Sequence, residues 1–291
     1  MANTWIVCED EQIANLISIA KEIGGNVNVL VAGDAQISGA DHVIRVPISA
    51  NVPVEAYAGA ISEILAHDVE EGDVVLCVNS ATGRVLAGAI AATLDAPVLT
   101  GVKEISAGSA TRLRFGGIVK EEVAFSSGVV AVIDGTGEAG SDGANAVDKS
   151  VEPYSATVSS VDASEGKKVN LASARRIVAA GRGFAKEEDL DIARDLAQAL
   201  EAELGCSRPL AEGAGWLDRD AYVGISGQHV SPDIYVAIGI SGQIQHTAGM
   251  VDSKTVIAIN NDDKAVIFEK ADYGIVGDLY TVLPELTQAL K

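Results

Sequence analysis

The chain has 291 residues, 48% of them hydrophobic, and its 41 acidic and 21 basic side chains give a formal net charge of −20. This length predicts two globular domains, because domains typically hold roughly 100 to 200 residues. The acidity argues against nucleic acid and against an anionic membrane surface as partners, since both are bound through clusters of Lys and Arg. The simplest interpretation of the charge is a solvated surface, and docking onto a basic partner is the alternative.

Three cysteines, Cys8, Cys77 and Cys206, lie far apart in the sequence and form no C-x-x-C pair. This pattern is typical of reduced thiols in a cytosol rather than of a disulfide framework or a zinc site. The N-terminus lacks a basic region followed by a long apolar segment, and no later window is apolar over the roughly 18 residues that a membrane span needs. We therefore expect a cytoplasmic protein without a metal and without membrane insertion.

The first half of the chain alternates short β-branched segments with alanine-rich stretches of helical spacing. This alternation is typical of an α/β fold, in which a mainly parallel sheet is flanked by helices. The predicted strands are residues 5–8, 27–32, 42–46 and 73–79. The predicted crossover helices are residues 11–23, 53–67 and 84–94.

The pattern changes after residue 97. Strand-like segments such as 110–115 and 128–133 follow one another without a long helix between them, which predicts antiparallel pairing. The segment 135–149 is rich in glycine and polar residues, and it is predicted to be a mobile loop or linker.

The alternation of strands and helices restarts after Lys168. The predicted strands are residues 176–180, 222–225, 234–238 and 256–260. A long helix is predicted at 187–204 and a last one from Asp278. The sequence therefore predicts two α/β domains, residues 1–165 and residues 166–291.

Four polar, glycine-containing clusters in the second domain are expected at the carboxyl edge of its sheet, where α/β proteins bind ligands. The first is GRG at residues 181–183, whose glycines permit close backbone approach and whose Arg182 offers a fixed positive charge for phosphate. An ordinary turn with a solvated arginine is the simpler interpretation of these three residues alone.

The second cluster, GCSRP at residues 205–209, is interpreted as the end of the long helix, because Pro209 stops a helix. A turn does not explain Arg208, whose guanidinium in a buried pocket would stabilise negative charge on a ligand. The third cluster, VGISG at residues 223–227, offers backbone N–H groups and a hydroxyl suited to a heterocycle. An ordinary strand-ending turn explains it equally well.

The fourth cluster, SGQIQH at residues 241–246, follows the apolar strand IYVAIGI and predicts a glycine turn that opens a helix. Backbone N–H groups at a helix N-terminus favour a phosphate or another anion. His246 is a candidate ligand contact, although a lone histidine is more often a core or surface residue.

None of the four clusters matches G-x-G-x-x-G or a phosphate loop ending in G-K-[ST], and the sequence has neither G-x-S-x-G nor H-E-x-x-H. The residues by themselves thus predict only that the second domain binds an anionic, nucleotide-like ligand.

Taken in order, the clusters closely resemble the C-terminal domain of electron transfer flavoprotein alpha subunits. The match runs from about Leu171 to Lys291, and its most specific parts are AAGRGF, GCSRPL, GISGQIQHTAGMVDSK, VIAINND and ADYGIVGDLYTVLPEL. The N-terminal half resembles the family more loosely, through SATGRVLAGAIAATLDAPVLTGV and RFGGIVKEEV. The resemblance implies a Rossmann-like second domain that binds FAD.

In that family FAD lies extended across the second domain. The residues that the resemblance assigns to FAD are Arg182, Ser207, Arg208, Val223, Gly224, Ile225, Ser226, Ser241, Gly242, Gln243, Ile244, Gln245, His246, Asn260, Asp278 and Leu279. By resemblance, Arg208 lies against the isoalloxazine and stabilises the reduced, anionic flavin. Ser226 donates to the redox-active nitrogen, and His246 lies near the pyrimidine carbonyl.

Three positions qualify the resemblance. Where the family commonly has V-G-Q-T-G-K, this chain has VGISGQ at residues 223–228, so a polar contact is lost at Ile225 and a basic residue at Gln228. Flavin binding is expected to survive this departure, with an effect on the flavin potential. Asp278 also suits the N-cap of the last helix, which is an account independent of flavin.

The resemblance implies an electron carrier rather than an enzyme. As the alpha subunit of a heterodimer with a beta subunit, the chain would pass electrons from a flavin dehydrogenase to an acceptor oxidoreductase, and residues 1–165 would supply much of the beta-subunit interface. The alternative is an NAD-dependent transferase or deacetylase on a similar nucleotide-binding domain, which would need a catalytic Lys or His beside the pocket.

Overall fold

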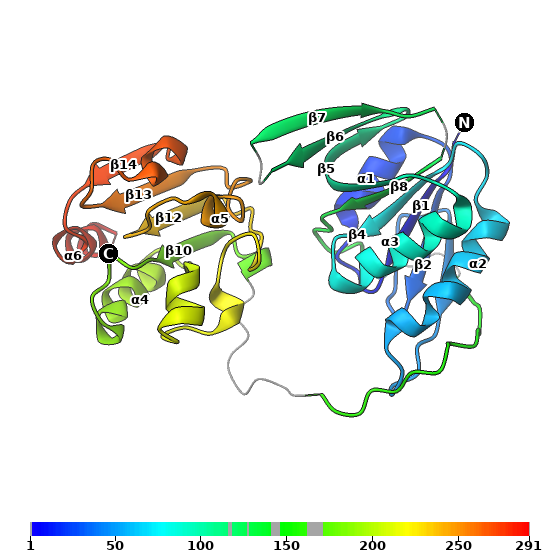
Figure 1. The fold of residues 1–291 in the computed structure, drawn as a ribbon, viewed down its shortest axis with the longest axis horizontal. Helices are drawn as coiled ribbons and strands as arrows, with labels where there is room; N and C mark the ends of the chain where they lie inside the picture. Colours follow the sequence, from blue (N-terminus) through cyan, green and yellow to red (C-terminus); the bar gives the residue numbers. More distant parts are fainter. Residues whose placement is uncertain (1, 116–117, 127, 141–145, 162–170, 291) are drawn as a thin grey trace. The chain divides into compact units, whose positions relative to one another are not determined.

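The computed structural model describes residues 2–115, 118–126, 128–140, 146–161 and 171–290. The chain divides into two units, Met1–Asp162 and Ala163–Lys291, each built on its own sheet (Figure 1). The boundary predicted between residues 165 and 166 lies outside the described residues. Both units have a mainly parallel sheet flanked by helices, which confirms the predicted α/β fold class.

The N-terminal unit holds, among the described residues, a nine-stranded sheet in the order β7-β6-β5-β8-β4-β1-β2-β3-β9. Its strands are β1 (Thr4–Cys8), β2 (Val27–Ala32), β3 (His42–Val46), β4 (Val74–Val78), β5 (Val98–Ser106), β6 (Ser109–Arg114), β7 (Val119–Ala124), β8 (Val129–Ile133) and β9 (Ala146–Asp148). The pairs β5–β6 and β6–β7 are antiparallel, as predicted for the region after residue 97, and the other pairs are parallel.

Helices cover both faces of this sheet (Figure 1). They are α1 (Ala14–Ile23), α2 (Ala58–Asp68), preceded by the 3-10 turn Val54–Tyr57, and α3 (Ala81–Leu94). Leu16 and Ile17 of α1 pack with the side chains on one face, whereas Ile61 of α2 and Leu86 of α3 pack with those on the other. Strand residues alternate between the two cores because successive side chains point to opposite faces.

The segment 135–149, predicted to be a mobile loop or linker, is a loop only in part. Residues 135–140 have no regular secondary structure, but a strand follows. Within this segment β9 pairs in parallel with β3, and Arg45 Nε lies 2.8 Å from Asp148 Oδ1. The backbone N–H of Ala14 also donates to the carbonyl of Gly137 at 3.0 Å, so the sheet and α1 hold the described parts of the segment. Residues 141–145 lie outside the described residues.

The C-terminal unit holds, in its described part, a five-stranded parallel sheet in the order β11-β10-β12-β13-β14. Its strands are β10 (Arg176–Ala180), β11 (Glu203–Cys206), β12 (Ile234–Ile238), β13 (Val256–Asn260) and β14 (Tyr273–Val276). Its helices are α4 (Leu190–Ala199), α5 (Ile244–Thr247) and α6 (Leu279–Ala289), with short helical turns at Leu171–Ser173, Glu187–Asp189, Pro209–Gly213, Arg219–Ala221 and Val266–Lys270.

The two faces of this second sheet are covered differently. The long helices contribute Leu190 and Leu196 of α4 and Leu283 of α6 to one core. The other core receives Val223, Met250 and further residues of irregular segments between the strands. The face without long helices is therefore covered by irregular segments, including those around Val223, Ile240 and Met250.

The predicted helix at 187–204 is too long. Its α-helical part, α4, ends at Ala199, and Glu201 adopts a positive φ of 50°, a left-handed conformation that ends helices without the help of glycine. Gly205, expected as the stop, lies inside β11, so the cluster at 205–209 follows a strand rather than a helix. Residues 222–225 form only isolated bridges instead of the predicted strand, and β14 was not predicted.

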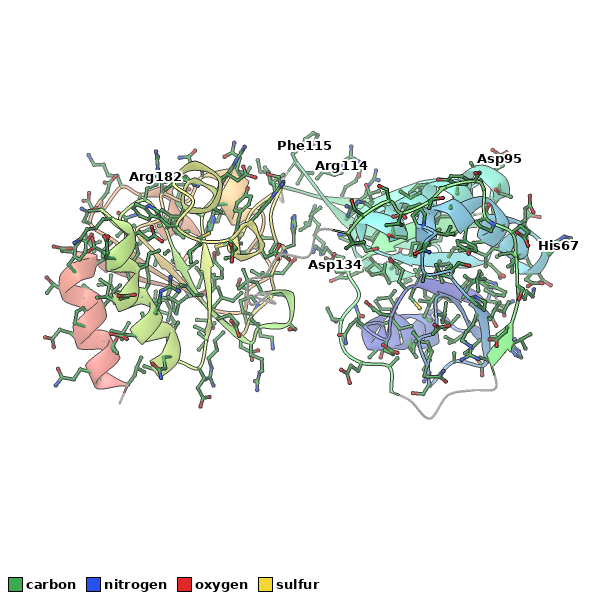
Figure 2. All side chains as sticks on the ribbon, turned by 90° about the horizontal axis from the view of Figure 1, so that it is seen from below. His67, Asp95, Arg114, Phe115, Asp134 and Arg182 are labelled. Atoms are coloured by element: carbon green, nitrogen blue, oxygen red, sulfur yellow. The ribbon has the colours of Figure 1, made fainter. Side chains whose placement is uncertain are left out.

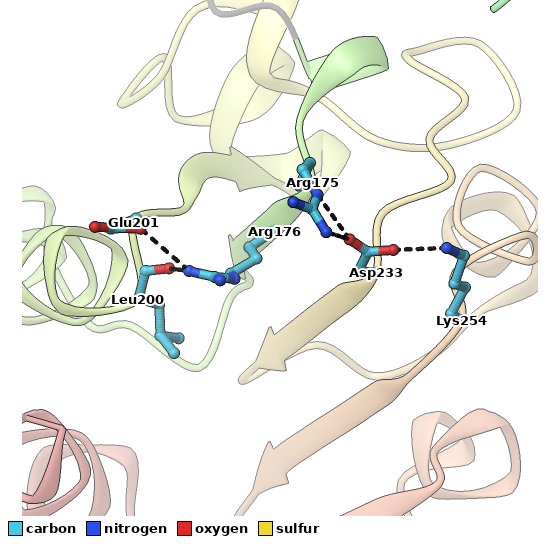
Figure 3. Close-up of polar contacts among 6 residues, drawn as sticks. All are labelled: Arg175, Arg176, Leu200, Glu201, Asp233 and Lys254. Carbon is cyan, nitrogen blue, oxygen red and sulfur yellow. Dashed lines mark hydrogen bonds and ion pairs between the residues drawn. The ribbon is translucent and has the colours of Figure 1, made fainter.

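Ion pairs occupy the amino edge of this sheet (Figure 3). Asp233 accepts from Lys254 Nζ at 2.7 Å and lies 2.8 Å from the Arg175 guanidinium. Hydrogen bonds from Lys254 and Arg175 hold the pKa of Asp233 below its ordinary value. Arg176 donates to the Leu200 carbonyl at 2.8 Å. These contacts tie together the beginnings of β10, β12 and β13.

Candidate functional site

A cleft of about 700 Å³ lies at the carboxyl edge of the C-terminal sheet. Its walls come from the loops that follow β10, β11, β12 and β13. The chain passes from β10 to β11 on one side and then to β12 on the other, so the loops diverge at β10. Such a reversal in strand order is where α/β sheets bind ligands.

The structure brings half of the predicted site residues together in this cleft. Those that line it are Arg182, Ser207, Arg208, Ser241, Gln243, Gln245, His246 and Asn260. They come from all four loops, which are separated by up to about eighty positions in the sequence.

The other predicted residues do not line the cleft. They are Val223, Gly224, Ile225, Ser226, Gly242, Ile244, Asp278 and Leu279. Val223 and Leu279 are buried in the cores, whereas Ile225 is 50% exposed. Asp278 caps α6, because its Oδ1 accepts from the N–H of Tyr280 at 3.0 Å, as the sequence predicted.

Arg182 lies on the loop after β10 (Figure 2) and makes no ion pair with a described residue. Arg208 does not point into a buried pocket: its side chain is 63% exposed, and its Nε lies 2.7 Å from Glu212 Oε2. Both side chains present a guanidinium, a planar cation whose N–H groups pair with phosphate or carboxylate oxygens. The cleft thus offers two guanidinium groups, one of them shared with a carboxylate.

Ser226 contacts the cleft indirectly. Its hydroxyl lies 3.3 Å from that of Tyr222, and Tyr222 lines the cleft. Tyr222 is itself buried. The two hydroxyls therefore form a hydrogen-bonded pair at this wall, in which Tyr222 borders the cleft and Ser226 lies behind it.

His246 is buried, and its Nε2 lies 2.9 Å from the hydroxyl oxygen of Tyr235. Burial lowers the pKa of His246 to about 4, against a smaller opposing effect of the Val223 backbone. Nδ1 has no hydrogen-bond partner among the described residues, so the Val223 contact falls short of hydrogen-bond geometry. The imidazole at the cleft wall is therefore neutral and retains one unpaired nitrogen.

Glycines allow the loops of the site to pack on one another. Gly239 adopts a φ of 60°, and a Cβ on it would lie 2.7 Å from Gly183 Cα. Gly242 adopts a φ of 84°, and a Cβ there would lie 2.1 Å from the backbone N of Ile267. Only glycine tolerates both the dihedral angle and the contact. Chain packing therefore accounts for these glycines.

The expected turn before a helix is present, since α5 begins at Ile244. It has only four residues, so its dipole contributes little. Asn260 serves the protein itself: its Nδ2 donates to the Ile240 carbonyl at 2.9 Å and its Oδ1 accepts from the Asp262 N–H at 3.0 Å.

Sequence reasoning missed several residues of the cleft wall. Asp262, Lys264 and Val266 follow β13 as the recognised clusters follow other strands, and the same rule would have found them. Tyr222 had no local signal, because it reaches the sheet through a single bridge to Cys206. Tyr235, the partner of His246, lies inside an apolar strand.

Comparison with known proteins agrees with this geometry. Residues 170–251 match the family model described as the electron transfer flavoprotein FAD-binding domain, and residues 10–152 match that of the electron transfer flavoprotein domain. The chain is 34% identical to Protein FixB of Escherichia coli O6:K15:H31 (strain 536 / UPEC) over 308 residues, which cover 99% of this chain and 98% of that protein. Protein FixB of Salmonella typhimurium (strain LT2) is 33% identical over the same shares.

The fold, the cleft and these matches together define a flavoprotein that carries the FAD-binding domain of electron transfer flavoproteins. The chain belongs to the electron transfer flavoprotein alpha subunit family. Its cofactor is FAD, as the sequence predicted.

The residues present fit that cofactor. A volume of about 700 Å³ lies within the usual range of small-molecule sites. Arg182, Arg208 and Lys264 supply positive charge for an anionic nucleotide, and the unpaired Nδ1 of His246 is a buried polar atom that the described protein leaves unsatisfied. Within the described part of the chain, no helix has the length and apolar character needed to span a membrane, and no group of three acidic, His or Cys side chains is placed to hold a metal.

Proposed function

We propose that this chain is the alpha subunit of a heterodimeric electron transfer flavoprotein, which shuttles electrons between a flavin dehydrogenase and an acceptor oxidoreductase. The observation that carries the proposal is the cleft at the strand-order reversal, where Arg182, Arg208 and His246 meet within the region that matches the family's FAD-binding domain. FAD, when bound, supplies the electron chemistry, and the protein supplies binding, orientation and electrostatics.

Three side chains of the cleft suit the pyrophosphate and the ribityl chain. Arg182 has no ion-pair partner among the described residues and is free to pair with phosphate oxygens. The hydroxyls of Ser207 and Ser241 line the same cleft and supply neutral donors. We therefore assign these three side chains to the phosphates and ribityl chain.

Arg208 and His246 are assigned to the isoalloxazine. A guanidinium near the ring stabilises the negative charge that reduction brings, and this effect grows when the partner subunit and the cofactor exclude water. Glu212 shares that guanidinium at 2.7 Å, so it moderates the effect and orients the side chain. Neutral His246 contributes a directed hydrogen bond rather than a charge.

An electron carrier without its own substrate turnover is consistent with the state of the reactive side chains. His246 is neutral, buried and bonded to Tyr235, which makes it a weak general base. Burial raises the pKa of the Cys206 thiol to about 12, so little reactive thiolate forms. Turnover of NAD with release of nicotinamide, the activity of the alternative transferase or deacetylase, is therefore not expected, and a nicotinamide-release assay checks this.

The N-terminal unit is proposed to supply the beta-subunit interface. Phe115 follows β6 (Figure 2), and Ile118 immediately precedes β7. Their side chains are 72% and 70% exposed. Exposed large apolar side chains mark protein interaction sites when they cluster. We place the heterodimer in the cytoplasm, since Cys8, Cys77 and Cys206 are all buried free thiols.

Co-expression with a beta subunit of the family tests the proposal. The purified complex is expected to be yellow, with FAD released on denaturation, and to change its absorbance on stepwise reduction. The chain expressed alone is expected to retain less FAD. A stable complex that contains no flavin would overturn the assignment.

A further inference from the structure

The buried pair Tyr235 and His246 joins the central strand of the FAD-binding sheet to the wall of the cleft. Tyr235 lies on β12 with no exposed surface, and His246 lies on the four-residue helix α5. The hydroxyl oxygen and Nε2 are 2.9 Å apart, and the rings are tilted by 56° at a centroid distance of 6.1 Å. A rigid strand thus holds the imidazole of a very short helix.

The direction of this hydrogen bond decides which nitrogen carries the ring proton. Neutral imidazole has one donor and one acceptor nitrogen, and a phenol has a single donor. Among the described residues, Nε2 is the hydrogen-bond partner of the Tyr235 hydroxyl. If the tyrosine donates, its buried proton is satisfied and the ring proton lies on Nδ1. The reverse direction leaves the buried phenol proton and Nδ1 both unpaired, which is the costlier arrangement.

Two further observations agree with a proton on Nδ1. Both groups are neutral, since burial raises the pKa of Tyr235 and lowers that of His246. The Val223 backbone also favours the protonated ring, which is the effect of a nearby carbonyl rather than of an N–H group. Nδ1 is nevertheless without a hydrogen-bond partner in the described part of the chain.

We propose that Tyr235 is a positioning residue that donates to Nε2 of His246, fixes the imidazole as the Nδ1–H tautomer and so sets the orientation of the ring that lines the cleft. The inference rests on the proposed function, because it takes the cleft to be the FAD site. Tyr235 does not line the cleft and acts only through His246. Fixing a tautomer through the second ring nitrogen is a general device of functional histidines.

The tautomer is measured directly by ¹⁵N NMR of the heterodimer labelled at histidine. The His246 signals are assigned by their loss in His246→Gln. The wild type is expected to show protonated Nδ1 and unprotonated Nε2, and Tyr235→Phe a mixture of tautomers. A proton on Nε2 in the wild type would overturn the inference without need of any variant, and so would an unchanged tautomer in Tyr235→Phe.

The flavin potential provides the second measurement. Tyr235→Phe is expected to reduce the preference for reduced over oxidised FAD about tenfold, which corresponds to about 30 mV for a two-electron couple. The same substitution in a His246→Gln background is expected to have no further effect. An equal shift in that background would show that Tyr235 acts through another group and would overturn the inference.

A matched control is Tyr57→Phe. Tyr57 is also fully buried, and its hydroxyl bonds to Ser49 at 3.2 Å in the N-terminal unit. This variant is expected to leave both the His246 tautomer and the potential unchanged, and a change equal to that of Tyr235→Phe would overturn the inference. A wild-type heterodimer that lacks flavin contradicts the proposed function, whereas a wrong tautomer contradicts only the role of Tyr235.

Discussion

At the carboxyl edge of the N-terminal sheet, polar side chains bond to one another. Asn79 Nδ2 donates to Asp134 Oδ1 at 2.7 Å, Arg84 donates to Asn79 Oδ1 at 2.9 Å, and Lys103 lies 3.2 Å from Asp134 Oδ2. At the same edge of the C-terminal sheet, Arg182 has no such partner among the described residues, and Arg208 shares one carboxylate at the mouth of a 700 Å³ cleft.

In this chain, the edge that forms the cleft is the one where Arg182 has no ion-pair partner among the described residues. In the N-terminal unit the cations are matched by carboxylates and amides of the chain itself. In the C-terminal unit the carboxylate Asp233, which holds two cations, lies at the amino edge, away from the cleft (Figure 3). Both units are built on a mainly parallel sheet, but the carboxylates that pair with the cations lie at different edges: Asp134 at the carboxyl edge of the first sheet and Asp233 at the amino edge of the second.

The largest expected effect comes from Gly242→Ala. Its φ of 84° and a Cβ 2.1 Å from the Ile267 N require the loop of the cleft to move. We expect a cost of more than about 3 kcal/mol and FAD retention reduced by at least about 100-fold. Flavin absorbance per heterodimer measures this.

Gly72→Ala in the N-terminal unit is the control for that substitution. Gly72 has a φ of 94° but no atom within 4 Å of an added Cβ, so it tests backbone strain without the contact. We expect unchanged flavin content. Equal loss of flavin in both variants would show that backbone strain alone, and not the contact with Ile267, accounts for the effect.

The second prediction concerns pH. The folded pKa of His246, about 4, lies below its ordinary value of 6.5 because the ring is buried. As the pH falls from 7 to 4, the unfolded chain takes up a proton that the native chain does not, so unfolding becomes easier by about 3 kcal/mol. Hydrogen exchange of the β12 amides is expected to show this loss in the wild type and not in His246→Gln.

His67→Gln serves as the matched control, because His67 is an exposed histidine of the N-terminal unit (Figure 2). We expect its pH dependence to equal that of the wild type. If His246→Gln retained the full acid sensitivity, other groups would be responsible for it.

The third prediction separates charge at the cleft from charge near it. Arg208 and Arg219 both pair with Glu212, at 2.7 and 3.5 Å, but only Arg208 lines the cleft. We expect Arg208→Ala to weaken the binding of reduced FAD by about 1.5 kcal/mol, or about tenfold, because a charge-assisted interaction is lost. Reductive titration of the heterodimer measures it, and Arg219→Ala is expected to behave as the wild type.

The smallest effects are expected at two helix caps. Ser80 Oγ accepts from the Gly83 N–H at 2.7 Å, and Asp278 caps α6. We expect Ser80→Ala and Asp278→Ala each to cost about 1 kcal/mol of stability, measured by exchange of the amides in α3 and α6. If the flavin content per heterodimer were unchanged in Ser80→Ala but reduced in Asp278→Ala, Asp278 would have a role beyond helix capping.

Much of the fold was predictable because its signals are local. The apolar runs at β1, β2, β10 and β12 and the helical spacing of α3 predicted strands and a helix within a few residues. The end of α4 was not predictable, because Glu201 adopts a left-handed conformation and the sequence has no glycine there to indicate it. Strand β14 was missed because its four residues are all exposed and it lies at the sheet edge.

The sequence by itself determined the family, the two α/β units, the cofactor and the loops that carry the site, since motif order and periodicity are properties of the chain. Only the tertiary structure decided which residues of those loops meet. A single β-bridge to Cys206 holds Tyr222 at the cleft wall. Tyr235, on strand β12, forms a hydrogen bond with His246, and Glu212 accepts one from Arg208. These contacts depend on sheet order and burial, which fix distances and pKa values that no local pattern contains.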